Sequence, residues 1–275
     1  MPGPTFLGVS LKMYLGYQHT LRWAEQVAAI AGAHPAVQDG LTDLVVLPSF
    51  PALPAVYGVV AGTGVQVGAQ NLSSYDQGAL TGEVGAPMLA EIGCRYAEVG
   101  HAERRGLFGE TDAVVAEKTL AALRNGLTPV LCVGEPARTT PTDAARTCIR
   151  QTAAAVVLAA AQSVPAPLVV AYEPHWAIGA AQPAPTEYIQ QVCREVGNWL
   201  AQQSAMNGSR IIYGGSAGPG LLTRLGDAVD GLFLGRFAHN PAAIASILDE
   251  AAVFARPNHL QPDHTQPGHP VGATR

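Results

Sequence analysis

The fold class can be inferred from residues 96–135, which read YAEVGHAERRGLFGETDAVVAEKTLAALRNGLTPVLCVGE. Two short apolar runs, at residues 96–101 and 128–134, flank a segment whose apolar residues recur at three- and four-residue spacing over 113–123. The runs predict buried strands, and the spacing predicts an amphipathic helix. Nearly continuous apolar strands that alternate with helices indicate a parallel sheet covered by helices.

The same alternation extends over most of the chain. Eight apolar runs begin at residues 5, 43, 65, 96, 128, 167, 210 and 231, and further helical patterns cover residues 21–30 and 241–253. Eight strand–helix units in about 250 residues favour a closed (β/α)₈ barrel, an α/β fold, with a doubly wound open sheet as the alternative. Residues 1–255 contain no linker or break in composition, so we expect a single barrel domain there.

The composition is that of a protein with a large core. The chain of 275 residues is 48% hydrophobic and only 13% charged, with a formal net charge of −5. This apolar content argues against intrinsic disorder. No cluster of Lys and Arg would neutralise a run of phosphates, so we expect no nucleic-acid partner. Residues 256–275 differ, because their prolines, histidines and few apolar residues predict a disordered tail.

The sequence also bears on the compartment. Its four cysteines lack CxxC spacing, so we expect reduced thiols in a cytoplasmic protein. The opening MPGPTFLGVSLK has no basic segment before its apolar stretch, unlike a secretory signal. Residues 151–172 carry no charge, but Pro165 and Pro167 interrupt them. These residues resolve into an Ala-rich helix and a strand rather than a membrane span, and we expect no membrane partner.

Reactive side chains follow several of the predicted strands. In a parallel barrel, such groups act where strands end and loops begin. Lys12 follows the first strand, His101 the fourth and Glu173 the sixth, and the last two strands end in Gly-Gly-Ser at 214–216 and Gly-Arg at 235–236. Each side chain also has a structural interpretation, as an ion pair or a helix cap. Their placement on one face of the barrel favours a common site.

The neighbouring residues indicate the chemistry. His101 precedes a predicted helix, whose positive end favours a neutral ring suited to polarising a carbonyl. After Glu173, the segment HWAIGAA at 175–181 follows a proline and ends in small residues, as a lid that excludes water would. The backbone N–H groups of 214–216 suit a phosphate dianion. Together these features predict proton abstraction beside the carbonyl of a phosphorylated small molecule.

Five strings resemble the triosephosphate isomerase family in order and spacing: YAEVGHAERR, FGETD, PVLCVGE, AYEPHWAIG and RIIYGGS. The resemblance extends from about residue 5 to 254 and implies a TIM barrel and an aldose–ketose isomerase that needs no cofactor or metal. It implies that Glu173 is the base that moves a proton through an enediolate. His101 would be the neutral electrophile and Lys12 the stabilising cation, a pattern known for this family.

The resemblance implies further site residues and a partner. Glu103 would support the catalytic residues, Gly179 and Ser216 would bind phosphate, and Gly235 would complete the phosphate cradle. The string LTGE at 80–83 resembles the dimer loop of the family. We therefore expect a small phosphosugar substrate and a homodimer formed through the 78–83 loop.

Several residues depart from the family pattern. Ser10 replaces the substrate-contacting asparagine of an Asn-x-Lys sequence, and Ala102 replaces a serine after the histidine. Ala180 and Ala181 replace the Thr-Gly hinge of the lid. Arg236 stands where the family has glycine, so its guanidinium would either add a bidentate phosphate contact or point outward and pair structurally.

Three functions are consistent with the sequence. The first is interconversion of dihydroxyacetone phosphate and glyceraldehyde 3-phosphate. The alternative is isomerisation of a four-carbon ketose phosphate such as erythrulose phosphate, because the small side chain of Ser10 makes room for one more carbon. The third is a non-catalytic phosphosugar-binding barrel, which the altered hinge favours. The presence of Lys12, His101 and Glu173 opposes this third function.

Overall fold

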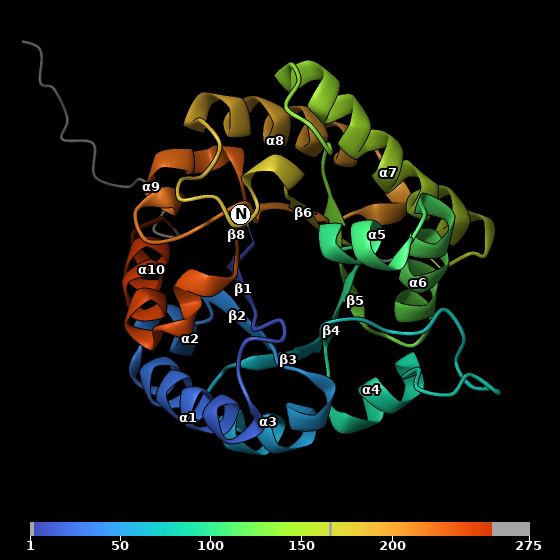
Figure 1. The fold of residues 1–275 in the computed structure, drawn as a ribbon. Helices are drawn as coiled ribbons and strands as arrows, with labels where there is room; N and C mark the ends of the chain where they lie inside the picture. Colours follow the sequence, from blue (N-terminus) through green and yellow to red (C-terminus); the bar gives the residue numbers. More distant parts are fainter. Residues whose placement is uncertain (1–2, 165–166, 255–275) are drawn as a thin grey trace, which may run out of the picture.

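The computed structural model describes residues 3–164 and 167–254, and it shows eight parallel strands closed into a barrel in sequential order (Figure 1). The strands are β1 (Thr5–Ser10), β2 (Thr42–Leu47), β3 (Gln66–Ala69), β4 (Tyr96–Val99), β5 (Thr128–Val133), β6 (Val169–Tyr172), β7 (Arg210–Tyr213) and β8 (Gly231–Leu234). Strand β1 pairs with both β2 and β8, which closes the barrel. The closed barrel is confirmed, and the open-sheet alternative is excluded.

Helices surround the barrel on its outer face (Figure 1). The α-helices are α1 (Tyr17–Ala33), α2 (Pro35–Gln38), α3 (Leu53–Val60), α4 (Ala86–Ile92), α5 (Ala102–Phe108), α6 (Asp112–Arg124), α7 (Pro141–Ala161), α8 (Thr186–Leu200), α9 (Leu221–Leu225) and α10 (Pro241–Phe254). Short 3₁₀ helices are η1 (Phe50–Ala52), η2 (His175–Ala177), η3 (Ser204–Met206), η4 (Gly226–Ala228) and η5 (Arg236–His239). The three helical patterns in the sequence fall within α1, α6 and α10.

The connection between β4 and β5 contains two helices, one directly after His101 and one over the 113–123 pattern, as predicted. Helix α5 ends at Gly109, whose φ of 68° is a left-handed conformation that glycine adopts without strain. Helix α6 then begins with Thr111 as its N-cap, whose hydroxyl accepts a hydrogen bond from the backbone N–H of Val114. His101 is the N-cap of the short helix α5, so it lies at the end of the barrel where the strands finish.

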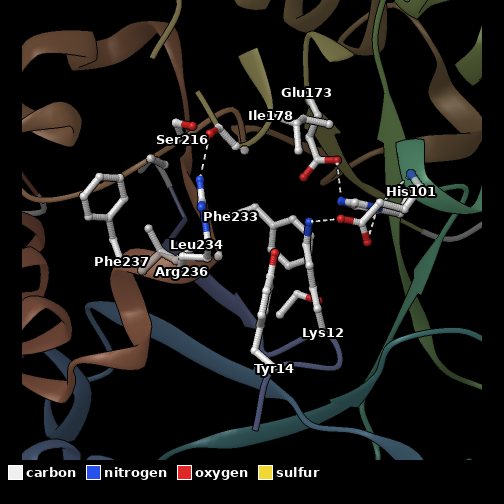
Figure 2. A pocket seen from close by; sticks show the side chains of 16 residues that line it. Lys12, Tyr14, His101, Glu173, Ile178, Ser216, Phe233, Leu234, Arg236 and Phe237 are labelled. Carbon is white, nitrogen blue, oxygen red and sulfur yellow. Dashed lines mark hydrogen bonds and ion pairs between the residues drawn. The ribbon is translucent and has the colours of Figure 1, made fainter. Parts of the chain in front are cut away.

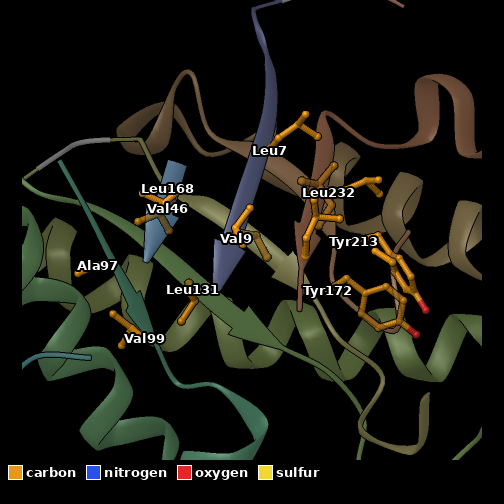
Figure 3. Close-up of a cluster of buried hydrophobic side chains, with 14 of the residues drawn as sticks. Leu7, Val9, Val46, Ala97, Val99, Leu131, Leu168, Tyr172, Tyr213 and Leu232 are labelled. Carbon is orange, nitrogen blue, oxygen red and sulfur yellow. The ribbon is translucent and has the colours of Figure 1, made fainter. Parts of the chain in front are cut away.

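The core has two layers, because successive side chains of a strand point to opposite faces. Leu7 and Val9 point outward and pack under the helices with residues such as Tyr172 and Tyr213 (Figure 3). The barrel interior is filled by Phe6, Val45, Leu47, Tyr96, Val130, Cys132, Val169, Ala171, Ile212 and Phe233. The strand alternation therefore directs Glu98, two residues after Tyr96, into this interior layer.

The sequence also made predictions about the cysteines, membrane-spanning segments and the C-terminal residues. The four cysteines are buried and unpaired with one another. Within the described parts of the chain, no helix combines the length and hydropathy that a membrane crossing requires. The predicted tail, residues 256–275, lies outside the described residues.

Candidate active site

A pocket of about 290 Å³ opens at the carboxyl ends of the strands. All the residues that the sequence predicted for the site line it: Ser10, Lys12, His101, Glu103, Glu173, Gly179, Ser216, Gly235 and Arg236. Figure 2 shows Lys12, His101 and Glu173 on one side of the pocket and Ser216 and Arg236 on the other. The fold therefore brings together side chains from five separate strand ends.

Glu173 directly follows β6 and is only 4% exposed. Its Oε2 lies 3.3 Å from Nε2 of His101 yet makes no hydrogen bond to any described residue. Burial, reinforced by the nearby Glu98 carboxylate, raises the pKa of Glu173 to about 8. Gly214 lies against this side chain, and a Cβ there would be 2.5 Å from Oε1. The site thus holds an under-solvated carboxylate, which is a strong base when ionised.

His101 is held as a neutral ring. Its Nδ1 accepts a hydrogen bond from the backbone N–H of Glu103 at 3.1 Å, so the proton of the neutral imidazole resides on Nε2. Nε2 is the ring nitrogen that faces Glu173. Burial and the positive charge of Lys12 lower the pKa of His101 to about 4. The ring can therefore donate a hydrogen bond into the pocket without carrying a charge.

Lys12 reaches the same side of the pocket from a constrained loop. Its φ of 50° is uncommon for a residue other than glycine. The Ser49 hydroxyl and the Gln70 amide donate hydrogen bonds to its carbonyl at 3.1 and 3.0 Å and hold this conformation. The ammonium lies 2.6 Å from Oε1 of Glu103. Burial lowers the pKa of Lys12, but the carboxylates of Glu103 and Glu173 outweigh it and raise the pKa above its ordinary value.

The opposite end of the pocket connects the lid segment to the loops after β7 and β8. The Ser216 hydroxyl lies 2.9 Å from the carbonyl oxygens of both Ala177 and Ala180. Nη2 of Arg236 donates to the carbonyl of Gly179 at 2.7 Å (Figure 2). Of the two alternatives predicted for Arg236, the structure shows a structural pair. Its partner is a carbonyl of the lid segment in the pocket lining rather than a group outside the pocket.

The lid segment is also anchored at both ends by residues that sequence reasoning missed. The indole N–H of Trp176 donates to Oε1 of Glu135 at 2.8 Å. The backbone N–H of Ala184 donates to the Tyr213 hydroxyl at 3.2 Å. These contacts anchor the chain on both sides of Ile178 and Gly179, which line the pocket. Glu135 ends the string PVLCVGE, so the available signal was a carboxylate two residues after the end of β5.

Glu98 was missed as well. This carboxyl is 3% exposed and accepts a hydrogen bond from the Ser10 hydroxyl at 2.8 Å. Burial raises its pKa to about 7. The signal is a charged residue inside an otherwise apolar strand, YAEV, away from the strand ends at which reactive side chains are expected.

The described residues include no group of three or more His, Cys, Asp or Glu side chains that is arranged to hold a metal ion. The side chains described above are instead suited to moving a proton. They comprise a buried carboxylate whose Oε2 makes no hydrogen bond, a neutral imidazole beside it, and an ammonium group, with Ser216 and Gly235 lining the far end of the pocket.

The chain is similar to known isomerases over nearly its whole described length. The family model for triosephosphate isomerase matches residues 5–251. L-erythrulose-1-phosphate isomerase of Pectobacterium atrosepticum is 58% identical over 245 residues, which cover 89% of this chain and 95% of the relative. Triosephosphate isomerase of Magnetococcus marinus is 42% identical over 227 residues, with 78% and 89% covered. Probable triosephosphate isomerase 2 of Listeria monocytogenes is 34% identical over 248 residues, with 88% and 95% covered.

Proposed function

Because the chain belongs to the triosephosphate isomerase family, we propose that it isomerises a four-carbon ketose 1-phosphate of the erythrulose type. Family membership makes it an isomerase of a small phosphosugar. The observation that carries the choice of substrate is the 58% identity to L-erythrulose-1-phosphate isomerase, against 42% to a triosephosphate isomerase. The sequence placed the triose phosphate first, and these identities favour the alternative.

The substrate determines which proton moves. In a ketotetrose 1-phosphate, C1 carries the phosphate ester and C2 is the carbonyl, so C3 carries the acidic proton beside a hydroxyl. Glu173 removes this C3 proton, and the electron pair forms the C2–C3 double bond of an enediolate with charge on O2. Transfer of a proton from the Glu173 carboxyl group to C2, with formation of the C3 carbonyl, completes the isomerisation. The product is a second ketose phosphate, whereas a triose phosphate would interconvert with an aldose.

The other side chains stabilise this charge. The Nε2–H of His101 donates to the substrate oxygens and carries the hydroxyl proton from O3 to O2 as the double bond shifts. The ammonium of Lys12 offsets the negative charge that develops on O2. Since Glu103 pairs with Lys12 and its backbone N–H fixes the His101 tautomer, it acts as a positioning residue.

The phosphate would be held at the far end of the pocket. Backbone N–H groups of Gly179, Ser216 and Gly235 are available there, and the Arg236 guanidinium adds positive charge. The lid segment excludes water from the carboxylate, which preserves the basicity of Glu173 and protects the enediolate from loss of phosphate.

The test compares two substrates with purified protein. NMR in D₂O follows conversion of L-erythrulose 1-phosphate and dihydroxyacetone phosphate. It also follows deuterium entry at C3 of the tetrulose phosphate or at the hydroxymethyl carbon of the triose phosphate. We expect kcat/KM for the tetrulose phosphate to exceed that for the triose phosphate by about tenfold or more, which corresponds to about 1.4 kcal/mol of discrimination. Equal or faster turnover of the triose phosphate would overturn the substrate assignment.

A second arm tests catalysis itself. Replacement of Glu173 by Gln removes the base without changing its size, so turnover of both substrates should fall by about 10²- to 10⁴-fold. Background rates that are equal in the Glu173→Gln variant and the wild type would instead support a non-catalytic phosphosugar-binding barrel.

A further inference from the structure

One buried carboxyl group beneath the pocket has no part in the mechanism above. Glu98 projects from β4 into the interior layer, where its neighbours on adjacent strands include Val130 and Cys132. A carboxyl group in such a layer is unfavourable unless it is hydrogen-bonded. Among the described residues, the hydrogen bond from Ser10 is the one that its side chain makes.

The Ser10–Glu98 pair connects two strands that are three places apart in the closed barrel. Ser10 ends β1 and lines the pocket, whereas Glu98 lies on β4, which is opposite β8 in the closed strand order. The loops proposed to hold phosphate follow β6, β7 and β8. The Ser10 hydroxyl is therefore directed away from the phosphate end.

The fourth carbon of the substrate must occupy the same region. When the phosphate is held by the loops after β6 to β8, and C2 and C3 face Lys12, His101 and Glu173, the C4 hydroxymethyl group extends from C3 away from the phosphate. A triose phosphate has only hydrogen at this position. A residue that contacts C4 would therefore distinguish the two substrates.

We propose that Ser10 and Glu98 together recognise the C4 hydroxyl group of the ketotetrose phosphate, an inference that rests on the proposed function. Because the Ser10 hydroxyl donates its proton to Glu98, its oxygen lone pairs are left to accept a hydrogen bond from the substrate. The short serine side chain leaves space for the extra carbon, and Glu98 fixes the orientation of the hydroxyl.

The arrangement changes the polarity of the pocket wall. An asparagine at position 10, as the family pattern has it, would present an N–H donor to the substrate and would fill the space proposed for C4. Ser10, whose hydroxyl proton is donated to Glu98, presents a hydrogen-bond acceptor and leaves space for C4. Discrimination by a buried hydrogen-bonding group is stronger than discrimination by one methylene, because the substrate that lacks the hydroxyl leaves the group unpaired.

The first test measures the specificity ratio, kcat/KM for L-erythrulose 1-phosphate divided by that for dihydroxyacetone phosphate. In Glu98→Gln and in Ser10→Ala, we expect this ratio to fall by about tenfold or more. The double variant should lose no more than about the larger single loss, because the two side chains act as one unit. Parallel losses with both substrates, or an unchanged ratio, would overturn the proposal.

The matched control is Glu110→Gln. Glu110 is also a buried carboxyl group, but its partners are Lys118 and Arg104, outside the pocket lining. Its loss should lower thermal stability and leave the specificity ratio within about twofold. A ratio change in Glu110→Gln equal to that in Glu98→Gln would show that loss of any buried charge has this effect, and would overturn the proposal.

A binding experiment separates this proposal from the proposed function. Competitive inhibition constants are measured for L-erythritol 1-phosphate and glycerol 3-phosphate, the reduced analogues of the two substrates. We expect the wild type to favour the four-carbon analogue and both single variants to lose that preference. If the wild type turns over no tetrulose phosphate, the proposed function fails. If the wild type favours the four-carbon analogue and the variants keep that preference, only the Ser10–Glu98 proposal fails.

Discussion

At the scale of single residues, burial shifts the pKa values of Glu173 and His101 in opposite directions. Burial disfavours charge, so it raises the pKa of Glu173 to about 8 and lowers that of His101 to about 4. The neutral ring polarises a carbonyl without competing for the proton, and the carboxylate gains basicity. Glu98 contributes to the first shift, because its charge repels that of Glu173.

The first prediction concerns the pH dependence of Glu98→Gln. The groups that face Glu173 are Glu98, Lys12, Glu103, His101 and Cys132. Glu98 and Glu103 raise the pKa of Glu173, whereas Lys12 and the Cys132 thiol lower it. Glu173 must be ionised to act, so activity rises with pH through its pKa. Removing the Glu98 carboxylate should shift the acid limb of the kcat/KM profile to lower pH.

The pH profile is measured with dihydroxyacetone phosphate. This substrate has no C4 hydroxyl group, so loss of the proposed C4 contact does not affect its kcat/KM. An acid limb in Glu98→Gln that stays at the wild-type position, or moves to higher pH, would contradict the predicted repulsion. Glu110→Gln is the control and should leave the limb in place.

The second prediction concerns the space beside the base. In Gly214→Ala, the new Cβ would approach Oε1 and Cγ of Glu173 to 2.5 and 2.7 Å. The side chain can move, so the fold should persist while the carboxylate is displaced. A misplacement of about 1 Å reduces rate by about 100-fold, which we expect in kcat. Gly32→Ala, in α1 with open space at its Cβ, is the control and should retain wild-type kcat.

Thermal unfolding distinguishes displacement of the base from general damage. A Gly214→Ala protein with wild-type kcat would show that Glu173 tolerates the added methyl group. A protein that fails to fold would show that the contact is not relieved by the side chain alone.

At the scale of the element, the lid combines local and long-range determinants. The sequence predicted a lid from the proline at its start and the small residues at its end, and these are local features. Its anchors were not predicted, because Trp176 binds Glu135 from 41 residues away and Ala184 binds Tyr213 from 29 residues away. The hinge residues Ala180 and Ala181 depart from the family pattern, and the Ser216 and Arg236 contacts fall on the same part of the lid.

The third prediction is that Arg236 holds the lid. Arg236→Gly removes the hydrogen bond to Gly179 and should raise KM by about tenfold, since a hydrogen bond from a charged group contributes about 1.5–3 kcal/mol. Arg236→Gln keeps an N–H donor without the charge and should recover most of that loss. Arg146→Ala, an exposed arginine on α7 paired with Asp143, is the control and should leave KM unchanged.

Steady-state kinetics with both substrates checks this prediction. Equal losses in Arg236→Gly and Arg236→Gln would assign the effect to attraction of the phosphate by the guanidinium instead. A salt dependence of KM that disappears in both variants would support the same reassignment.

At the scale of the whole molecule, the barrel was predictable because the same strand–helix pattern repeats along the sequence. Eight apolar runs alternate with helical patterns, and this number of units is the number that closes a (β/α)₈ barrel. The proximity of Lys12, His101 and Glu173 was predictable as well, because each follows a strand and all the strand ends lie on one face of the barrel. The Ser10–Glu98 contact was not predictable, because it joins residues 88 apart and depends on the closure and stagger of the barrel. Similarly, nothing local indicated that the Arg236 side chain would bind the Gly179 carbonyl of the lid segment, 57 residues away.

The last prediction is a homodimer formed through the 78–83 loop. Residues 75–83 are exposed, but the base of the loop is fixed where Arg124 and Asn125 hold the Asp76 carboxylate at 2.8–3.1 Å. Large apolar side chains are exposed on this loop and on α4, which follows it directly: Tyr75, Leu80 and Met88. A projecting loop with a fixed base and an apolar tip is suited to packing into a second copy of the chain.

Sedimentation equilibrium should give twice the chain mass of 28.5 kDa for the wild type. Leu80→Glu places a charge in the proposed interface and should shift the protein toward the monomer, because burying an unpaired charge is strongly unfavourable. Val157→Glu, an equally drastic change at an exposed position on α7, should remain dimeric. If the dimer persists in Leu80→Glu, the subunits associate through another face, and the exposed apolar side chains around the loop then need a different partner.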